Sequence, residues 1–398
     1  MVTLQQIEAA TARIRGEIYV SPLVHSKALS TLSGNEIYLK LDNLQMTGSF
    51  KERGALNRIL TLTDAEKARG VVAASAGNHG QAVAYHATRR GIRAQIWMPR
   101  YTPLVKLSAT RNYGGDVVLH GNSYDEAFEG AIAQDATFVH AFDDEAVIAG
   151  QGSLGLEMLD QNPELDVIVT SIGGGGLASG VACAVKGRKP SIEVVGVQTS
   201  RLPSMVAALA EGAPVRVAAG STLADGIAVR KAGGFTLPMV REYVDNVVTV
   251  DEGDIAAAIL YLLEREKTLA EGAGAIGVAA VLQRLTGHRG KKIGVIVSGG
   301  NLDVTLLARI IEQGMVRDGR RLRVRVTLPD YPGALEGLAA RIAAAGANIV
   351  ETLHNRAHYG VSLTETAIDI TMETRGRDHV TEILSALSAA GYEFTMVE

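Results

Sequence analysis

The chain has 398 residues, of which 47% are hydrophobic and only 5% are aromatic, and its formal net charge is −4. This length and composition suit roughly two to three packed α/β domains, and the spread of charge along the chain excludes a basic surface of the kind that binds nucleic acid. The single cysteine, Cys183, excludes an intrachain disulfide and a cysteine-based zinc site.

Strand-like and helix-like segments alternate through most of the chain. We expect strands at residues 36–41, 71–75, 94–98, 116–119, 167–171, 194–198 and 292–298. We expect helices at residues 50–60, 81–89, 104–112, 123–134, 178–186 and 304–312. Such alternation is typical of βαβ units, so it predicts a mostly parallel sheet.

The pattern changes after residue 315. Residues 316–321 are rich in glycine and charge and are predicted to be a linker. Beyond it, the expected elements are a strand at 322–328, a helix at 333–345, strands at 348–354 and 362–373, a helix at 379–390 and a strand at 394–397. This βαββαβ order is that of the ferredoxin-like split unit. We therefore predict one domain at residues 1–315 and a second at 322–398.

The first motif that carries chemistry is Thr47-Gly48-Ser49-Phe50-Lys51-Glu52. Ser49 with Glu52 three residues later is the pattern of a capping box at a helix start. It places Lys51 in the first helical turn, where the helix dipole disfavours the ammonium form and favours the neutral amine that Schiff-base chemistry requires. Taken alone the motif is weak, because a lysine after a cap is usually a solvated surface residue.

Two further motifs join a strand to a helix through glycine. Ser75-Ala76-Gly77-Asn78-His79-Gly80-Gln81 offers the free N–H groups of a helix start, which suit a carboxylate. An ordinary turn, with His79 as a loop histidine of no chemical role, is the alternative. The run Gly173-Gly174-Gly175-Gly176-Leu177 costs conformational entropy, which presenting several N–H groups to a phosphate would explain. It is neither a Walker loop nor the dinucleotide fingerprint, and a flexible turn is the alternative.

The fourth motif is Ser298-Gly299-Gly300-Asn301, after a predicted strand. A hydroxyl at the carboxyl end of a strand can face a ligand in the crevice of an α/β sheet. A plain glycine turn fits the same residues.

Together and in this order, the four motifs resemble the fold-type II family of pyridoxal-phosphate (PLP) enzymes. The nearest branch is that of the threonine and serine dehydratases with serine racemase, and the resemblance covers about residues 5–315. It implies PLP as the cofactor and an α/β fold of two open twisted sheets with helices on both faces. A small subdomain at roughly residues 45–145 would be inserted in the larger one.

The resemblance also implies a role for each matched position. Lys51 would be the Schiff-base lysine and would move the Cα proton, and Phe50 would pack beside the cofactor. Asn78 would hydrogen-bond the 3′-oxygen of the pyridine ring, and Ser298 its nitrogen. The cofactor phosphate would be held by the backbone N–H groups of Gly173, Gly174, Gly175, Gly176 and Leu177. The substrate carboxylate would be held by Ser75, Asn78 and His79.

The implied reaction is deaminating dehydration of L-threonine to 2-oxobutanoate and ammonia, with L-serine to pyruvate as a secondary activity. It would serve isoleucine biosynthesis or threonine catabolism. A serine racemase or a dehydratase of another 3-hydroxy amino acid is the alternative. Racemases resembling this chain carry a serine where it has Ala76, and a methyl group cannot deliver a proton.

Four further positions bear on the resemblance. Relatives that bind a divalent ion carry carboxylates where this chain has Gln198 and Ser204, so we expect no divalent metal site, while a monovalent ion held by carbonyls stays open. Asp225 lies in a dehydratase-like stretch and can be structural or chemical. Glu271 stands where dehydratases carry an active-site carboxylate, and both a direct and an indirect role fit it.

The C-terminal segment at 322–398 resembles an ACT domain, a small amino-acid-sensing module. The turn Pro332, Gly333, Ala334 and Leu335 would let an effector, isoleucine or valine, approach the backbone. A single copy needs a partner to complete a paired sheet, so we expect a homodimer or homotetramer. A purely structural dimerisation domain is the alternative for this segment. For the whole chain the non-enzyme alternative is a sensing module without catalysis, against which the retained Lys51 and glycine loop speak.

Small amino acids are the expected partners, with no nucleic acid and no membrane. The charge-free stretch at residues 167–185 is long enough for a span, but glycines and hydroxyl residues interrupt it. Residues 1–12 carry Glu8 and no apolar core, unlike a secretory signal. We therefore expect a cytoplasmic protein.

Overall fold

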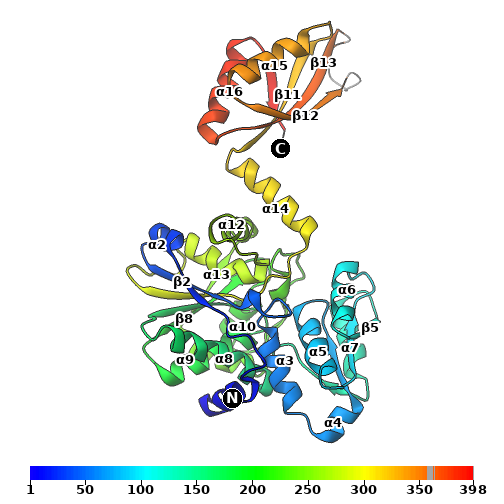
Figure 1. The fold of residues 1–398 in the computed structure, drawn as a ribbon, viewed down its shortest axis with the longest axis vertical. Helices are drawn as coiled ribbons and strands as arrows, with labels where there is room; N and C mark the ends of the chain where they lie inside the picture. The colour runs from blue at the N-terminus through cyan, green and yellow to red at the C-terminus, as the bar shows by residue number, and fades with distance from the viewer. Residues whose placement is uncertain (356–361, 363, 398) are drawn as a thin grey trace. The chain divides into compact units, whose positions relative to one another are not determined.

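The structure is a computed structural model that describes residues 1–355, 362 and 364–397. The chain divides into two compact units, Met1–Asp303 and Val304–Glu398, and each is described by itself. Figure 1 labels many of their elements. The division falls before the helix that starts at Val304, earlier than the predicted domain end at residue 315.

The first unit alternates strands and helices. Its strands are β1 (Leu23–Ser26), β2 (Glu36–Leu41), β3 (Val71–Ala74), β4 (Ala94–Met98), β5 (Asp116–Leu119), β6 (Thr137–Phe138), β7 (Val167–Ser171), β8 (Glu193–Thr199), β9 (Asn246–Val250) and β10 (Lys292–Val297). Its α-helices are α1 (Leu4–Ile14), α2 (Lys27–Ser33), α3 (Lys51–Leu60), α4 (Asp64–Arg69), α5 (Asn78–Thr88), α6 (Leu104–Asn112), α7 (Tyr124–Ile132), α8 (Glu145–Gln161), α9 (Gly176–Arg188), α10 (Ser204–Glu211), α11 (Thr236–Tyr243), α12 (Glu252–Tyr261) and α13 (Gly272–Leu282). Short helical turns are η1 (Asp42–Leu44), η2 (Asp225–Ile227) and η3 (Leu262–Glu266).

The smaller sheet of this unit has the order β5-β4-β3-β6, and all its strands are parallel. Side chains alternate between the two faces of a strand. Val71 and Ala73 of β3 therefore share a core with helices α3 and α5, whereas Val72 and Ala74 share one with Phe128 of α7. Figure 1 shows α5, α6 and α7 grouped around this sheet. Burial of β3 on both faces explains its uninterrupted apolar sequence.

The larger sheet has the order β1-β2-β10-β7-β8-β9, and only the edge strand β1 runs antiparallel. Ile168 and Ile296 face a core that they share with helices α8 and α9. On the opposite face, a Cβ added to Gly277 of α13 would lie 2.9 Å from the side chain of Val295 and 3.5 Å from that of Val169. Two sheets covered by helices on both faces confirm the predicted fold class.

Helix α3 is anchored by Arg53, whose side chain is fully buried. Its guanidinium donates to Asp42 (Nε to Oδ2, 2.7 Å) and to Glu157 (Nη1 to Oε1, 2.7 Å). The buried Lys40 ammonium donates to the same Glu157 at 2.8 Å. Two cations and two carboxylates thus neutralise one another in the interior and join α3 to η1, β2 and α8.

The prediction of a capping box at the start of α3 is wrong. Ser49 is buried, and its hydroxyl has no hydrogen-bond partner among the described residues. The Glu52 carboxylate accepts a hydrogen bond from the backbone N–H of Thr47, not of Ser49. The reason is that Ser49 forms a backbone bridge with Gly299, which commits it to a distant segment. Lys51 is nonetheless in the first helical turn, as predicted.

Two other helices begin earlier than predicted. Helix α5 begins at Asn78 instead of residue 81, and α9 begins at Gly176 instead of residue 178. Gly77 and Gly175 are the cap residues, and Gly175 has φ of 101°. Glycines read as loop from the sequence therefore belong to the helix starts themselves.

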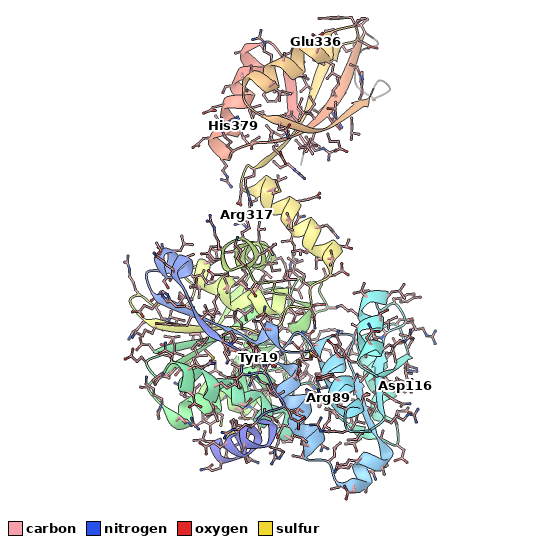
Figure 2. All side chains as sticks on the ribbon, in the orientation of Figure 1. Tyr19, Arg89, Asp116, Arg317, Glu336 and His379 are labelled. Atoms are coloured by element: carbon pink, nitrogen blue, oxygen red, sulfur yellow. The ribbon has the colours of Figure 1, made fainter. Side chains whose placement is uncertain are left out.

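The second unit contains α14 (Val304–Arg317), β11 (Arg321–Pro329), α15 (Ala334–Ala344), β12 (Asn348–Asn355), β13 (Glu365–Glu373), α16 (Arg377–Ala389) and β14 (Glu393–Met396). After α14 this is the predicted βαββαβ order. The strands form an antiparallel sheet with the order β12-β13-β11-β14, and Leu338, Ile342, Ile383 and Leu387 of the two helices pack against it. The buried ring of His379, labelled in Figure 2, places its Nε2 2.8 Å from the carbonyl oxygen of Ala345, the cap residue after α15.

The predicted linker at residues 316–321 is wrong in extent. Helix α14 continues to Arg317, and β11 begins at Arg321. The helix runs through Gly314, since one glycine inside a helix costs only about 1 kcal/mol. Of the strand predicted at 362–373, residue 363 lies outside the described residues, as do 356–361 and 398 of the predicted second domain.

Candidate active site

A cavity of about 640 Å³ lies in the first unit, and residues of all four motifs line it. The motifs reach it from the carboxyl ends of β3, β7 and β10 and from the starts of α3, α5 and α9. Both sheets contribute to its wall. Ligands of open α/β sheets bind at this end of the strands, so the topology that the sequence predicted brings the predicted residues together.

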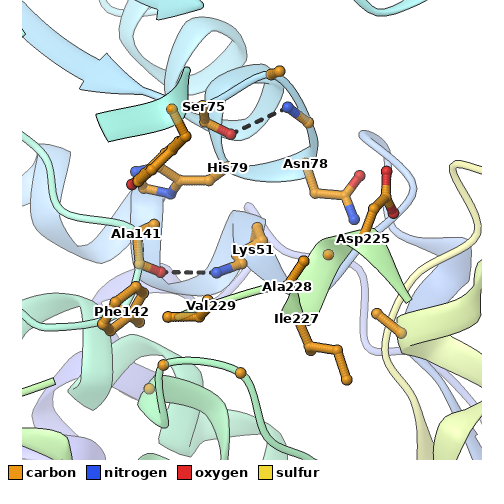
Figure 3. Close-up of a pocket in the computed structure, with 18 of the residues that line it drawn as sticks. Lys51, Ser75, Asn78, His79, Ala141, Phe142, Asp225, Ile227, Ala228 and Val229 are labelled. Carbon is orange, nitrogen blue, oxygen red and sulfur yellow. Dashed lines mark hydrogen bonds between the residues drawn. The ribbon is translucent and has the colours of Figure 1, made fainter. Parts of the chain in front are cut away.

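Lys51 extends into this cavity (Figure 3). Its Nζ donates a hydrogen bond to the carbonyl oxygen of Ala141 at 2.8 Å and lies 5.1 Å from the centroid of the Phe50 ring. Burial lowers the pKa of the Lys51 ammonium to about 8, against an opposing effect of the Glu271 carboxylate. The amine is therefore available as a nucleophile or base at mildly alkaline pH.

The segment from Ser75 to His79 forms a second wall of the cavity. The Ser75 hydroxyl accepts a hydrogen bond from the Gly77 N–H at 3.2 Å (Figure 3). Because α5 begins at Asn78, its first N–H groups have no carbonyl four residues earlier in the helix. Those of Asn78 and His79 donate no hydrogen bond within the described part of the chain. This helix start can therefore bind an anion.

The His79 ring is only 3% exposed, and its Nε2 lies 2.8 Å from the carbonyl oxygen of Val139. Burial, with a smaller effect of the Lys51 charge, lowers the pKa of His79 to about 3. The ring is then neutral at neutral pH, and Nε2 carries the proton that Val139 accepts. This geometry supports the interpretation of His79 as a structural histidine, although its ring also lines the cavity.

The glycine loop has no room for side chains, and its backbone N–H groups are unpaired. A Cβ on Gly174 would overlap the ring of Phe142, and one on Gly176 would lie 2.8 Å from the Phe142 carbonyl oxygen. Within the described residues, no backbone N–H group from Gly173 to Leu177 donates a hydrogen bond. The loop therefore presents unpaired donors at the start of α9, which is the arrangement that binds phosphate.

Ser298 is buried at the end of β10 and lines the cavity. Its hydroxyl donates to the carbonyl oxygen of Ala273 at 3.2 Å and lies 3.4 Å from the hydroxyl of Ser171. Its backbone carbonyl accepts from the Phe50 N–H at 3.0 Å. The fourth motif is thus bonded directly to the first.

Glu271 is a buried carboxylate in the cavity wall, with 5% of its surface exposed. Its Oε1 accepts a hydrogen bond from Asn78 Nδ2 at 2.7 Å, and no ion pair reaches it in the described part of the chain. Burial, reinforced by the nearby Asp225, raises the pKa of Glu271 to about 7. A carboxyl group with such a pKa can hold or release a proton at neutral pH.

Ion pairs between partly exposed side chains span the mouth of the cavity. Lys106 of α6 contacts Asp225 of η2 at 2.6 Å. Asp125 of α7 contacts Arg216 at 2.6 Å and Arg230 at 3.8 Å. The side chains of Asp225, Asp125 and Arg216 are about half exposed. The pairs join helices of the smaller sheet to the segment that precedes α11, so Asp225 has a structural contact here.

Some cavity residues were not expected from the sequence. Ala141 accepts the Lys51 hydrogen bond, and Phe142 packs against the glycine loop, yet neither lies in a motif. Asn301 lies in the fourth motif but had no role assigned, and its amide contacts Asn78 and Thr47. Its place directly after Gly300 was the one signal that could have identified it.

The segment at residues 198–204 caps a helix. Oε1 of Gln198 accepts hydrogen bonds from the backbone N–H groups of Met205 at 3.0 Å and Val206 at 3.1 Å, and Ser204 is buried at the start of α10.

Across the described residues, no three His, Cys, Asp or Glu side chains are gathered as metal ligands. Nor does any helix in the described ranges have the length and apolarity needed to cross a membrane.

The predicted regulatory turn lies in the second unit. Pro332 and Gly333 precede α15, whose first two residues are Ala334 and Leu335, and Gly333 is the cap residue at φ of 95°. A Cβ on Gly333 would meet no atom within 4 Å. Glycine is therefore required here by the backbone conformation and leaves open space above the turn.

Comparison with known proteins agrees with this geometry. Residues 14–299 match the family model described as pyridoxal-phosphate dependent enzyme. The chain is 48% identical over 401 residues to an L-threonine ammonia-lyase of Thermotoga maritima, with 100% of both chains covered. It is 40% identical over 315 residues to a catabolic L-threonine dehydratase of Escherichia coli, covering 78% of this chain and 96% of that one.

Solved structures of the same kind are similar to it. Threonine deaminase isoform 2 of Solanum lycopersicum matches with a TM-score of 0.74 and 35% identity, covering 78% of this chain and 92% of that chain. A maize serine racemase matches with a TM-score of 0.74 and 34% identity, covering 79% and 98%. The chain belongs to the family of pyridoxal-phosphate dependent enzymes of fold type II, in the group that contains the threonine ammonia-lyases.

Proposed function

We propose that this chain is an L-threonine ammonia-lyase that converts L-threonine to 2-oxobutanoate and ammonia, and L-serine to pyruvate as a secondary activity. The observation that carries the proposal is the cavity itself, where the Lys51 amine and the free N–H groups of the glycine loop face the same space. The similarity to a relative of that activity over the whole chain supports it.

The residues of the cavity fit the PLP cofactor of the family. The unpaired N–H groups from Gly173 to Leu177 suit its phosphate. In the proposal, Ser298 would hold the ring nitrogen, Asn78 would hold the 3′-oxygen, and Phe50 would pack beside the ring. Lys51 would be the covalent attachment point. When bound, PLP supplies the electron sink that makes the Cα proton of an amino acid acidic.

Proton movement in the reaction falls to two side chains of the cavity. Lys51 takes the Cα proton, since its pKa of about 8 leaves a usable fraction as the free amine. Glu271 is the second candidate, because its raised pKa of about 7 lets it hold a proton in the same cavity. Its hydrogen bond from Asn78 fixes the direction of the carboxyl group.

The substrate carboxylate is assigned to the wall formed by Ser75, Asn78 and His79. The free N–H groups at the start of α5 and the Ser75 hydroxyl are the donors available there. The His79 side chain fixes this wall through its hydrogen bond to Val139, and its own backbone N–H is one of the donors.

Racemisation is the competing activity, since serine racemase structures are similar to this one. It requires an acid on the face of Cα opposite the lysine. Ala76 lines the cavity at the position where racemases resembling this chain carry a serine. Its methyl group has no proton to deliver, which favours elimination.

We further propose that the second unit is an ACT domain that senses isoleucine or valine. Its βαββαβ order and the open turn at Gly333 support this. Isoleucine is the product expected downstream of 2-oxobutanoate. A homodimer or homotetramer would pair the sheets of two such domains.

Steady-state turnover of L-threonine, L-serine and 3-hydroxyaspartate by the PLP-loaded chain tests the proposal. We expect the highest kcat/KM with L-threonine and 2-oxobutanoate as the product. Chiral analysis of serine left after incubation with L-serine should show no D-serine. Formation of D-serine faster than pyruvate, or no turnover of L-threonine, would refute it.

A further inference from the structure

The side chain of Asn301 joins three segments of the cavity wall through one nitrogen atom. Its Nδ2 donates to the carbonyl oxygen of Thr47 at 2.7 Å and to Oδ1 of Asn78 at 2.8 Å. The Gln81 side-chain oxygen is more distant, at 3.4 Å. An amide nitrogen has two hydrogens, so the two short hydrogen bonds use both of them.

These contacts lie where three of the four motifs meet. Thr47 belongs to the segment that leads into Lys51, and Asn301 follows Ser298 by three residues. Backbone hydrogen bonds run alongside, including one from the Gly300 N–H to the Gly48 carbonyl oxygen at 2.9 Å. Gly48 has φ of 76°, and a Cβ there would overlap the Asn301 carboxamide. The backbone is therefore shaped to admit this side chain.

The consequence falls on Asn78. Because its Oδ1 accepts from Asn301, its Nδ2 points the other way and donates to Glu271 at 2.7 Å. A flipped Asn78 amide would set two NH2 groups against each other at Asn301 and two oxygens against each other at Glu271. Asn301 thus determines which end of the Asn78 amide is a donor toward Glu271.

We propose that Asn301 is a positioning residue for the dehydration, which orients the Asn78 amide and ties it to the segment that carries Lys51. The inference rests on the proposed function, in which Asn78 contacts the cofactor. Asn301 itself touches neither the cofactor nor the substrate in this assignment. Its effect on the reaction passes through Asn78.

Two variants of the full-length, PLP-loaded chain test this. Asn301→Asp keeps the shape but cannot donate, and Asn301→Ala removes the amide without adding charge. We expect kcat for L-threonine to fall at least about tenfold in both, because small misplacements of contacting groups are costly. KM should change less than kcat. The absorbance maximum of the bound cofactor, recorded in the absence of substrate, should differ from that of the parent. Asn162→Asp, outside the cavity, is the matched control and should behave as the parent.

The coupling to Asn78 is measured by a double-mutant cycle. In an Asn78→Ala background, Asn301→Ala should cause no further loss of kcat and no further spectral shift. The spectral comparison needs no turnover, so it holds even where the background is nearly inactive.

The outcomes separate the two proposals. Parent-like kcat and spectrum in Asn301→Ala would overturn the positioning role, as would effects of Asn301→Ala and Asn78→Ala that multiply independently. A loss seen in Asn301→Asp alone would attribute the effect to charge and also overturn it. If the parent binds PLP but does not convert L-threonine, the proposed function fails, while the spectral cycle still decides whether Asn301 orients Asn78.

Discussion

At the scale of single residues, Lys51 shows how a surface-like sequence position becomes a reactive one. Its amine is held by the Ala141 carbonyl, and its pKa is lowered to about 8 by burial. We expect Lys51→Ala to lower kcat for L-threonine at least about 10³-fold. Far-UV circular dichroism should show the fold retained. Turnover at the parent rate would contradict the assignment of Lys51.

His79 gives a prediction for the pH dependence of stability. Its pKa of about 3 in the folded protein lies below the ordinary value of 6.5, so the unfolded chain binds the proton more tightly. The neutral His79 ring therefore contributes to the free energy of unfolding, and this contribution is complete above pH 6.5. It is lost as the pH falls toward 3, by up to about 1.4 kcal/mol per pH unit.

The matched variant is His79→Gln, which can still donate to Val139 but does not titrate. Urea unfolding followed by the fluorescence of Trp97, the one tryptophan of the chain, reports on the smaller sheet. Between about pH 7 and pH 5, the parent should lose free energy of unfolding relative to the variant. A constant difference across this range would show that His79 does not titrate as stated.

Most of the proposed cavity residues could be predicted because they lie in short contiguous motifs. The contacts between them could not. The hydrogen bond between Asn78 and Glu271 joins residues 193 positions apart, and no local sequence pattern predicts it. The capping-box error has the same origin, since Ser49 is bound to Gly299 of a distant strand end. The local preference of a residue for a helix cap is overridden where tertiary contacts bind the same residue.

At the scale of elements, the anchoring of α3 sets the position of Lys51. Arg53 is fully buried between Asp42 and Glu157, so its removal leaves buried carboxylates uncompensated. We expect Arg53→Ala to lower the free energy of unfolding by about 3–5 kcal/mol. Arg58→Ala on the same helix, whose ion pairs with Glu66 and Asp144 are partly exposed, should cost at most about 1 kcal/mol.

Urea unfolding followed by Trp97 fluorescence measures both variants. Equal losses in the two would show that burial of Arg53 does not matter to α3.

Element types were predicted better than element ends. Seven of the ten strands in the two sheets of the first unit were predicted from their apolar runs, whereas β1, β6 and β9 were missed. Several helices, α8 and α13 among them, were not predicted. Helix α13 is buried from Gly272 to Val281, so it has no polar face to give a helical period. The starts of α5 and α9 are predicted too late because glycine is typical of loops as well as of helix caps.

At the scale of the whole molecule, the two units predict separable activities. The E. coli dehydratase aligns with 78% of this chain and 96% of its own length. That relative is therefore named as a dehydratase although it is shorter than this chain. We expect a chain that ends at Asp303 to retain L-threonine turnover and to lose the response to isoleucine or valine. Activity titrations with both amino acids measure this.

A full-length Gly333→Val variant is the second arm of that experiment. A β-branched residue is strained at φ of 95°, so the turn above α15 should change while the first unit stays intact. It should also lose the response. An unchanged response in the shortened chain would place the effector site in the first unit.

The ion pairs at the cavity mouth have a consequence for the exchange of small molecules with solvent. Exposed pairs such as Asp125 with Arg216 are worth no more than about 1 kcal/mol, and salt screens them. These pairs therefore contribute little free energy to the contact between the helices of the smaller sheet and the segment before α11, and that contribution falls as the ionic strength rises. Ionic strength should then alter how fast an amino acid enters and its product leaves, independently of the chemistry at Lys51.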